Sequence, residues 1–194
     1  MMNMSNIVDK LRNSKEKTYH YLALVCGAVL WGLIVWGLWT AFHSPDPQIT
    51  GMVTVYLTYA VLIGLFVLIS SAAYRASAFG NMILLGPEQF PELHAIVVAA
   101  SKELGLSQPP KTFLYNSNGL FNAFARRLMG GRYVFLTSAL VEANSDEQVR
   151  FVIGHEIGHH AAGHLNPWLN FVKLPAHLVP FLMRPYSRAR EYSC

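Results

Sequence analysis

Residues 145–160 read SDEQVRFVIGHEIGHH, and this stretch combines the signals of a helix start with a pattern of metal-binding side chains. Ser145 is a typical N-cap residue, and Gln148, three positions later, completes a capping box. The two residues between Ser145 and Gln148 are acidic, which suits the positive end of the helix dipole. The sequence therefore predicts a helix that begins at Ser145 and ends near Asn166-Pro167.

His155-Glu156-Ile157-Gly158-His159 is an H-E-x-x-H pentapeptide within this predicted helix. Positions i and i+4 share one helix face, so the imidazoles of His155 and His159 can reach the same Zn²⁺. Glu156 is rotated by about 100° from His155 and can accept a proton from a water that the metal activates. The pattern predicts one zinc ion per chain, with His155 and His159 as ligands and Glu156 as the general base of peptide hydrolysis.

Four further residues of the predicted helix, which is expected to run to about Asn166, need an explanation. Gly154 and Gly158 each cost about 1 kcal/mol of helix propensity relative to Ala, so we expect close packing of the helix against a strand or a substrate. His160 and His164 are rotated by about 140° and 180° from His155 on a continuous helix. We expect both to be polar residues on the far face or near a membrane surface.

Charged residues are scarce in this chain and unevenly distributed. The 194 residues are 53% hydrophobic and 13% charged, against about 25% charged in an ordinary soluble domain. Residues 21–42 and 52–73 contain no charged residue at all, and about 20 helical residues suffice to cross a bilayer. A signal peptide would have a shorter apolar region and an A-x-A-like cleavage site. We therefore predict a two-helix transmembrane anchor over residues 21–73.

The loops around these runs indicate their orientation in the bilayer. The leading segment, residues 1–20, contains four basic residues, Lys10, Arg12, Lys15 and Lys17. Arg75 follows the second run, whereas the connector 43–51 has no Lys or Arg. The positive-inside rule places residues 1–20 and everything after residue 75 on the cytoplasmic side. The net charge of +4 suits an anionic leaflet, and the absence of a basic stretch interleaved with aromatics argues against nucleic acid as a partner.

Residues 74–194 are predicted to form a separate domain with helices and a small sheet. Apolar residues recur at helical spacing over residues 91–104, and Gly105 follows as a typical helix stop. Residues 112–115 and 133–137 are short runs of aromatic and β-branched residues. We expect a sheet of two or three strands between helices, in a protein that is mainly α-helical.

Residues 168–183 form a third apolar stretch, WLNFVKLPAHLVPFLM. Lys173, Pro175, His177 and Pro180 interrupt it, and it is short for a clean crossing of a bilayer. The sequence predicts a membrane-associated segment that is interfacial, re-entrant or a broken span.

Three motifs, in this order, resemble the HtpX-like and CAAX-prenyl-protease group of membrane zinc metallopeptidases. They are Asn122-Ala123-Phe124-Ala125, the pentapeptide at 155–159, and Ser187-Arg188-Ala189-Arg190-Glu191-Tyr192. The resemblance covers roughly residues 75–194 and implies a zincin-like α+β metallopeptidase domain over residues 74–194. It implies that Glu191 is the third zinc ligand, and that a strand containing Asn122, Ala123 and Phe124 lies beside the active-site helix and pairs with the substrate backbone.

The resemblance also has consequences for the location of the protein and for its topology. It implies a membrane-anchored endopeptidase of peptide or membrane-protein substrates in a lipid bilayer, by family habit a bacterial inner membrane. Because Glu191 must reach the same zinc as His155, the stretch 168–183 must return to the side from which it starts. Segments before and after this stretch are therefore expected in the same compartment.

The sequence departs from the family pattern at its last residue. The family has Ala where Cys194 stands, and an Asp follows that Ala. Because the given chain stops at Cys194, we expect either a fragment of a longer protein or a truncated gene product. The alternative function is then a catalytically incomplete zinc-binding membrane or interaction protein.

Overall fold

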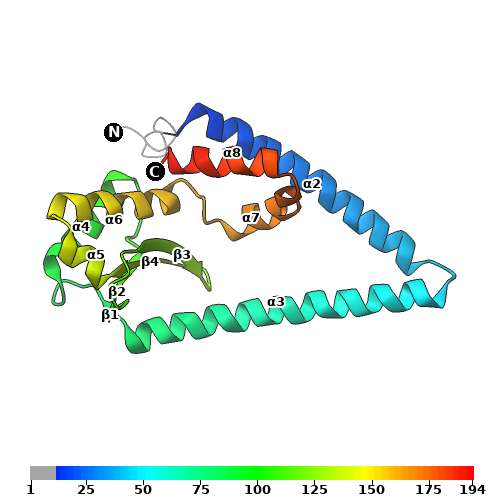
Figure 1. Cartoon of the computed structure of the whole chain (residues 1–194), viewed down its shortest axis with the longest axis horizontal. Helices are drawn as coiled ribbons and strands as arrows, with labels where there is room; N and C mark the ends of the chain where they lie inside the picture. The colour runs from blue at the N-terminus through cyan, green and yellow to red at the C-terminus, as the bar shows by residue number, and fades with distance from the viewer. Residues whose placement is uncertain (1–11) are drawn as a thin grey trace.

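Two long apolar helices dominate the computed structural model, which describes residues 12–194 (Figure 1). Helix α2 spans Ser14–Phe42 and helix α3 spans Pro47–Asn81. Both are long and apolar enough to cross a membrane, by length and composition. The part of the predicted N-terminal segment that includes Lys10 lies outside the described residues.

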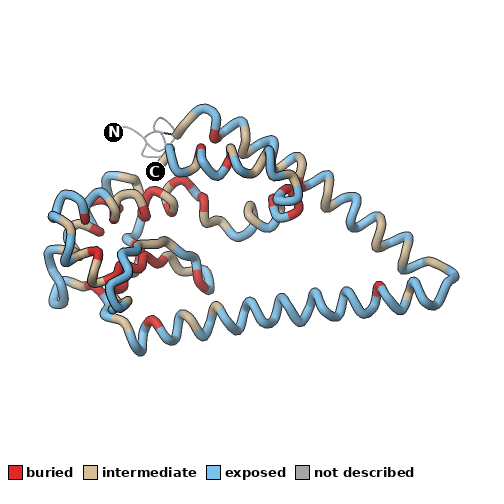
Figure 2. The backbone as a smooth tube through the Cα atoms, in the orientation of Figure 1, coloured by how far each residue is buried: buried red, intermediate tan, exposed pale blue. Residues whose placement is uncertain are grey.

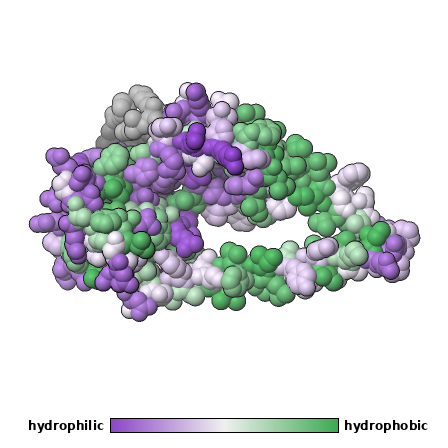
Figure 3. Space-filling view, in the orientation of Figure 1, coloured by the Kyte–Doolittle hydropathy of each residue, from purple (hydrophilic) through white to green (hydrophobic). Residues whose placement is uncertain are grey.

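Most large apolar side chains of α2 and α3 are exposed in the protein by itself. Figure 2 shows α3 exposed along most of its length, with buried residues gathered mainly in the sheet and the helices beside it. Figure 3 shows hydrophobic surface along much of both long helices and a mixed, more hydrophilic surface over the rest of the molecule. An exposed apolar surface of this extent is typical of a site of interaction with a membrane or another protein.

A four-stranded mixed sheet forms the centre of the second part of the chain, with the strand order β1-β2-β4-β3. The strands are β1 (Ile83–Leu84), β2 (Lys111–Tyr115), β3 (Ala123–Leu128) and β4 (Gly131–Thr137). Strands β2 and β4 are parallel, whereas β3 and β4 form an antiparallel hairpin. The strands predicted at 112–115 and 133–137 are confirmed as β2 and β4. The predicted number of two or three strands is too low, because β1 is only two residues long and has no periodicity to detect.

The hairpin turns at Met129 and Gly130, whose φ angles are 49° and 81°. Two consecutive positive φ values are those of a two-residue type I′ turn, the connection that matches the twist of antiparallel strands. Glycine adopts this conformation without steric cost. The turn therefore fixes the register in which Arg127 lies opposite Arg132.

Helices cover both faces of the sheet. On one face, Val134 and Leu136 pack with Val97 of α4 (Pro91–Glu103) and with Ile153 and Ile157 of α6 (Asp146–Ala161). On the other face, aromatic residues of β2 and β4 pack against the last turns of α3 through Ala78. The first helical turn after β4 is α5 (Ser138–Ala143).

Helix α6 spans Asp146–Ala161 and begins with the predicted capping box of Ser145 and Gln148. It ends earlier than predicted. The reason is Gly163, whose φ of 74° turns the chain out of the helix, as glycine typically does just past a helix end.

The chain then reverses direction over three short helices. These are α7 (Pro167–Lys173), the 3₁₀ helix η1 (Leu174–Leu178) and α8 (Pro180–Glu191). All three pack against α2, and Figure 1 shows α8 lying along α2 with its end near α6. The stretch 168–183 therefore turns back in space, while its association with a membrane stays a prediction.

Gly27 on α2 marks the closest approach between α2 and the segment that begins with α7. A Cβ at this position would collide with the carbonyl oxygen of Val172, whereas one at Gly32 would meet nothing within 4 Å. We expect Gly27→Ala to lower the stability by about 1–3 kcal/mol, the usual cost of overpacking. Gly32→Ala is the matched control and should be neutral or stabilising, because Ala favours helix by about 1 kcal/mol. Thermal unfolding in detergent measures both; equal midpoints would contradict the close approach.

Candidate metal centre

The two histidines of the H-E-x-x-H pentapeptide lie one turn apart on α6, with ring centroids 4.9 Å apart. Oε2 of Glu191, at the end of α8, lies 3.4 Å from Nε2 of His155 and 3.6 Å from Nε2 of His159. Ligand atoms at 2.0–2.1 Å from a tetrahedral zinc ion are about 3.4 Å apart. The spacing and the chemistry of these three side chains fit a zinc ion, although they come from segments distant in sequence.

Glu156 occupies a more enclosed position than the three ligand candidates. Its carboxyl is buried, and the burial raises its pKa. The nearby His155 and a hydrogen bond from the backbone of Ala125 in β3 act in the opposite direction. A carboxylate held in this way, beside a ligand and next to an edge strand, is suited to accept and return a proton.

A chain of hydrogen bonds continues behind His159. Nδ1 of His159 lies 3.0 Å from Nδ1 of His164, and Nε2 of His164 lies 3.1 Å from Oε1 of Glu16. Glu16 and His164 are only 1% and 2% exposed. Glu16 also pairs with Arg12 at 3.4 Å, so this carboxylate is buried with partners.

The proton positions in this series of hydrogen bonds follow from the chemistry of the three side chains. Burial, followed by the neighbours His164 and His155, lowers the pKa of His159 to about 4, so the imidazole is neutral at pH 7. A carboxylate can only accept, so His164 donates through Nε2 to Glu16 and accepts through Nδ1 from His159. His159 is then protonated at Nδ1 and presents a free Nε2 towards His155 and Glu191, as a metal ligand must.

His164 and His160 therefore differ from the expectation of polar residues on a far face or near a membrane. The expected angle of His164 assumed a continuous helix, but the turn at Gly163 brings its side chain back to His159. His160 is buried and donates from Nε2 to the carbonyl oxygen of Tyr133 at 3.0 Å. Glu16 gave no signal in the sequence, because its contact with His164 spans nearly the whole chain.

Cys194 also approaches this cluster. Its Sγ lies 3.4 Å from Nδ1 of His159 and 3.5 Å from Nδ1 of His164, so these three residues form a second grouping that could hold a metal. His159 cannot bind a metal through Nδ1 while it donates that proton to His164. Burial raises the pKa of the Cys194 thiol to about 12, which disfavours the thiolate that a metal requires. The grouping with Glu191 is the better fit.

The two glycines of the helix have different environments. A Cβ on Gly158 would lie 3.3 Å from Cβ of Cys194, so the close packing is against the end of the chain and not against a strand. A Cβ on Gly154 would meet nothing within 4 Å. Gly154 instead lines a cavity of about 370 Å³ that also contacts His155, Phe151 and Cys194.

The predicted substrate strand is found at the open edge of the sheet. Ala123 and Phe124 begin β3, which among the described residues pairs only with β4 and which packs beside α6. The backbone of Asn122 is already paired with Thr137 through bonds of 3.1 Å. Because pairing alternates along an antiparallel strand, the backbone groups of Ala123 and Ala125 face the open edge.

Comparison with known proteins shows that the central part of the chain is similar to a family of peptidases. Residues 87–174 match the model of Peptidase family M48, a segment that contains the H-E-x-x-H pentapeptide but not Glu191.

Curated relatives agree with that match. The chain is 37% identical over 95 residues to a "Protease HtpX homolog" of Pyrobaculum islandicum, covering 48% of this chain and 27% of that protein. It is 31% identical over 107 residues to a "Protease HtpX homolog" of Archaeoglobus fulgidus, covering 55% and 31%. It is 26% identical over 117 residues to "Plastoglobule-localized metallopeptidase 48, chloroplastic" of Arabidopsis thaliana, covering 58% and 33%.

The matched part of the chain thus spans a third or less of the length of these relatives. The resemblance to HtpX-like zinc metallopeptidases, predicted from three short motifs, is confirmed by a match over a much longer segment.

Substitutions of His164 test the orientation of His159. His164→Leu removes the acceptor for Nδ1 of His159, and we expect zinc affinity to fall about 10- to 100-fold, as is typical when such supporting partners are lost. His164→Asn keeps an oxygen near the position of Nδ1 and should lose less affinity. Competition with a chelating dye measures both; equal affinities of the two variants would contradict the role of this hydrogen bond.

Proposed function

We propose that this chain carries the catalytic centre and the membrane anchor of a zinc-dependent metalloendopeptidase. The observation that carries the proposal is the position of Glu191, whose carboxylate oxygen lies 3.4 Å and 3.6 Å from the Nε2 atoms of His155 and His159. Two histidines one turn apart on a helix do not by themselves bring an acidic side chain from a distant helix to within this distance. Similarity to M48 peptidases supports the same function.

His155, His159 and Glu191 would hold the zinc ion, one per chain. When bound, zinc polarises a carbonyl oxygen and acidifies water. Glu156 would act as general base, taking a proton on its carboxylate from the attacking water and passing it to the leaving amine. Its burial excludes bulk water from this transfer, and the hydrogen bond from Ala125 orients the carboxylate.

The substrate would bind as an extended strand along β3. The open backbone groups of Ala123 can pair with a peptide, in the way that edge strands accept an added strand. Asn122 and Phe124 would contribute through their side chains, because the backbone of Asn122 is engaged with Thr137. The cavity of about 370 Å³ beside His155 can receive a substrate side chain.

The anchor comprises residues 21–73, and the peptidase domain comprises residues 74–194. Basic residues of the leading segment 1–20 and Arg75 support a cytoplasmic location for both the N-terminus and the catalytic domain. This places the site near the membrane surface, where peptides and membrane proteins are accessible. A bacterial inner membrane is the setting that the family resemblance favours.

Zinc content and hydrolysis separate the roles of Glu156 and Glu191. We expect Glu156→Gln to retain one zinc per chain and to reduce peptide hydrolysis by about 10²–10⁴-fold, the usual contribution of a general base. Glu191→Ala should lose zinc or bind it much more weakly. Asp146→Asn, an exposed carboxylate on the same helix that lies outside the cavity beside His155, is the control. Undiminished hydrolysis by Glu156→Gln, or zinc binding indifferent to Glu191, would contradict the proposal.

Cysteine labelling tests the topology. In a chain with Cys26 and Cys194 replaced by Ser, single cysteines at Glu147 and Ser187 should react from the same compartment. A cysteine at Ser44, in the connector between α2 and α3, should react from the opposite one. Opposite compartments for the first two positions would separate Glu191 from the H-E-x-x-H helix.

A further inference from the structure

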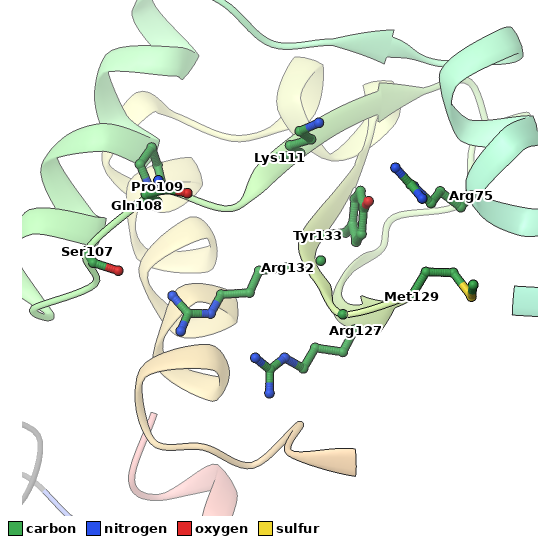
Figure 4. A pocket seen from close by; sticks show the side chains of 11 residues that line it. Arg75, Ser107, Gln108, Pro109, Lys111, Arg127, Met129, Arg132 and Tyr133 are labelled. Atoms are coloured by element: carbon green, nitrogen blue, oxygen red, sulfur yellow. The ribbon is translucent and has the colours of Figure 1, made fainter. Parts of the chain in front are cut away.

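A cationic pocket lies where the end of α3 meets the tip of the β3–β4 hairpin, away from the metal centre. Its volume is about 450 Å³, and four of its lining residues are basic, namely Arg75, Lys111, Arg127 and Arg132. None of the residues that line it is acidic. Figure 4 shows Arg127 and Arg132 extending from the hairpin on one side of the pocket, with Arg75 and Lys111 nearer to Tyr133 on the other.

These four cations have no carboxylate partner among residues 12–194. The acidic groups that form ion pairs there bind Arg12, Arg150 and histidines instead. Arg75 and Lys111 rest on the same ring, that of Phe79, at 5.8 Å and 5.0 Å from its centroid. A shared aromatic ring does not neutralise two positive charges.

The hairpin also holds two like charges in direct opposition. Arg127 and Arg132 are partners in the register of β3 and β4, and like charges directly opposite each other destabilise a sheet. Both also line a smaller cavity of about 270 Å³ next to His160. An arrangement that costs stability and has no counter-charge in the described chain is explained by an anionic ligand.

The position of the pocket indicates the source of the anion. Arg75 is the first charged residue after the uncharged run 52–73 of α3, so the pocket lies where the proposed span would leave the bilayer. Met129, exposed at the tip of the hairpin, adds an apolar side chain to the lining of the pocket. Guanidinium groups bind phosphate oxygens through paired hydrogen bonds.

We propose that this pocket binds the phosphate group of an anionic phospholipid of the cytoplasmic leaflet. The proposal rests on the membrane anchor proposed above but is independent of the zinc centre. Headgroup binding at this point would hold the sheet, and with it the edge strand β3, at a fixed distance from the membrane surface.

Native mass spectrometry of the full chain from neutral detergent tests this site by counting retained lipid. We expect phosphatidylglycerol, and not phosphatidylcholine, to be retained. Each basic residue near an anionic headgroup contributes about 5-fold, so Arg127→Gln with Arg132→Gln should weaken retention roughly 30-fold. Lys102→Gln with Arg150→Gln is the charge-matched control, since both residues are exposed and lie outside the pocket. Zinc content, which should be unchanged, reports whether the variants are folded.

A conservative variant and a soluble ligand complete the test. Arg127→Lys with Arg132→Lys keeps both charges and should recover most of the lipid retention. Inorganic phosphate in the millimolar range should not displace phosphatidylglycerol. Equal retention of phosphatidylglycerol by the parent chain, the pocket variant and the control would overturn the site. If inorganic phosphate displaces phosphatidylglycerol from the parent chain but has no effect on the double Gln variant, the lipid assignment would be overturned in favour of a soluble anion. Either result leaves zinc binding and hydrolysis, and so the proposed function, untouched.

Discussion

The buried hydrogen bonds from Glu16 through His164 to His159 join helix α2 to the end of α6, and the arrangement of the C-terminal helices depends on them. A buried carboxylate is tolerated only when it is paired, and here one partner, Arg12, is near in sequence and the other, His164, is distant. Arg12 donates to the carbonyl of Ala162 as well as pairing with Glu16. Arg190 of α8 donates to the carbonyl oxygen of His164 at 3.2 Å. The metal centre and the first long helix are therefore parts of one packed unit.

A second polar contact holds the middle of α8. The ammonium group of Lys173, which is buried, donates to the hydroxyl of Tyr186 at 2.8 Å, and the same hydroxyl lies 3.0 Å from Nδ1 of His20. Arg190, one turn further along α8, is bound to the carbonyl oxygen of His164, so α8 is held by α2 at Tyr186 and by the segment after α6 at Arg190. Glu191 itself is 57% exposed, so its position beside the histidines comes from the helix that carries it and not from its own burial.

Local features of this protein could be predicted from the sequence, and long-range ones could not. The capping box at Ser145, the helix ending near Gly105 and the two central strands follow from spacing and residue type within a few positions. His164 was misplaced because one glycine, Gly163, ends the helix before the angle calculated for it applies. The contact of Glu16 with His164 leaves no trace in any local pattern, since it depends on how α2 packs. Glu191 was found only through a family motif, because its partners are set by the chain reversal at η1.

Strand β3 links the candidate metal centre to the cationic pocket. Near its start, β3 carries Ala125, whose backbone is hydrogen-bonded to Glu156, and one residue before its end it carries Arg127, which lines the cationic pocket. Side chains alternate between the two faces of a strand, and a slip of one residue would exchange them. The type I′ turn at Met129-Gly130 prevents this slip by fixing the pairing of β3 with β4. The same turn therefore sets which backbone groups face the open edge and which charges face the end of α3, so the peptide position and the membrane distance proposed above would both depend on a single register.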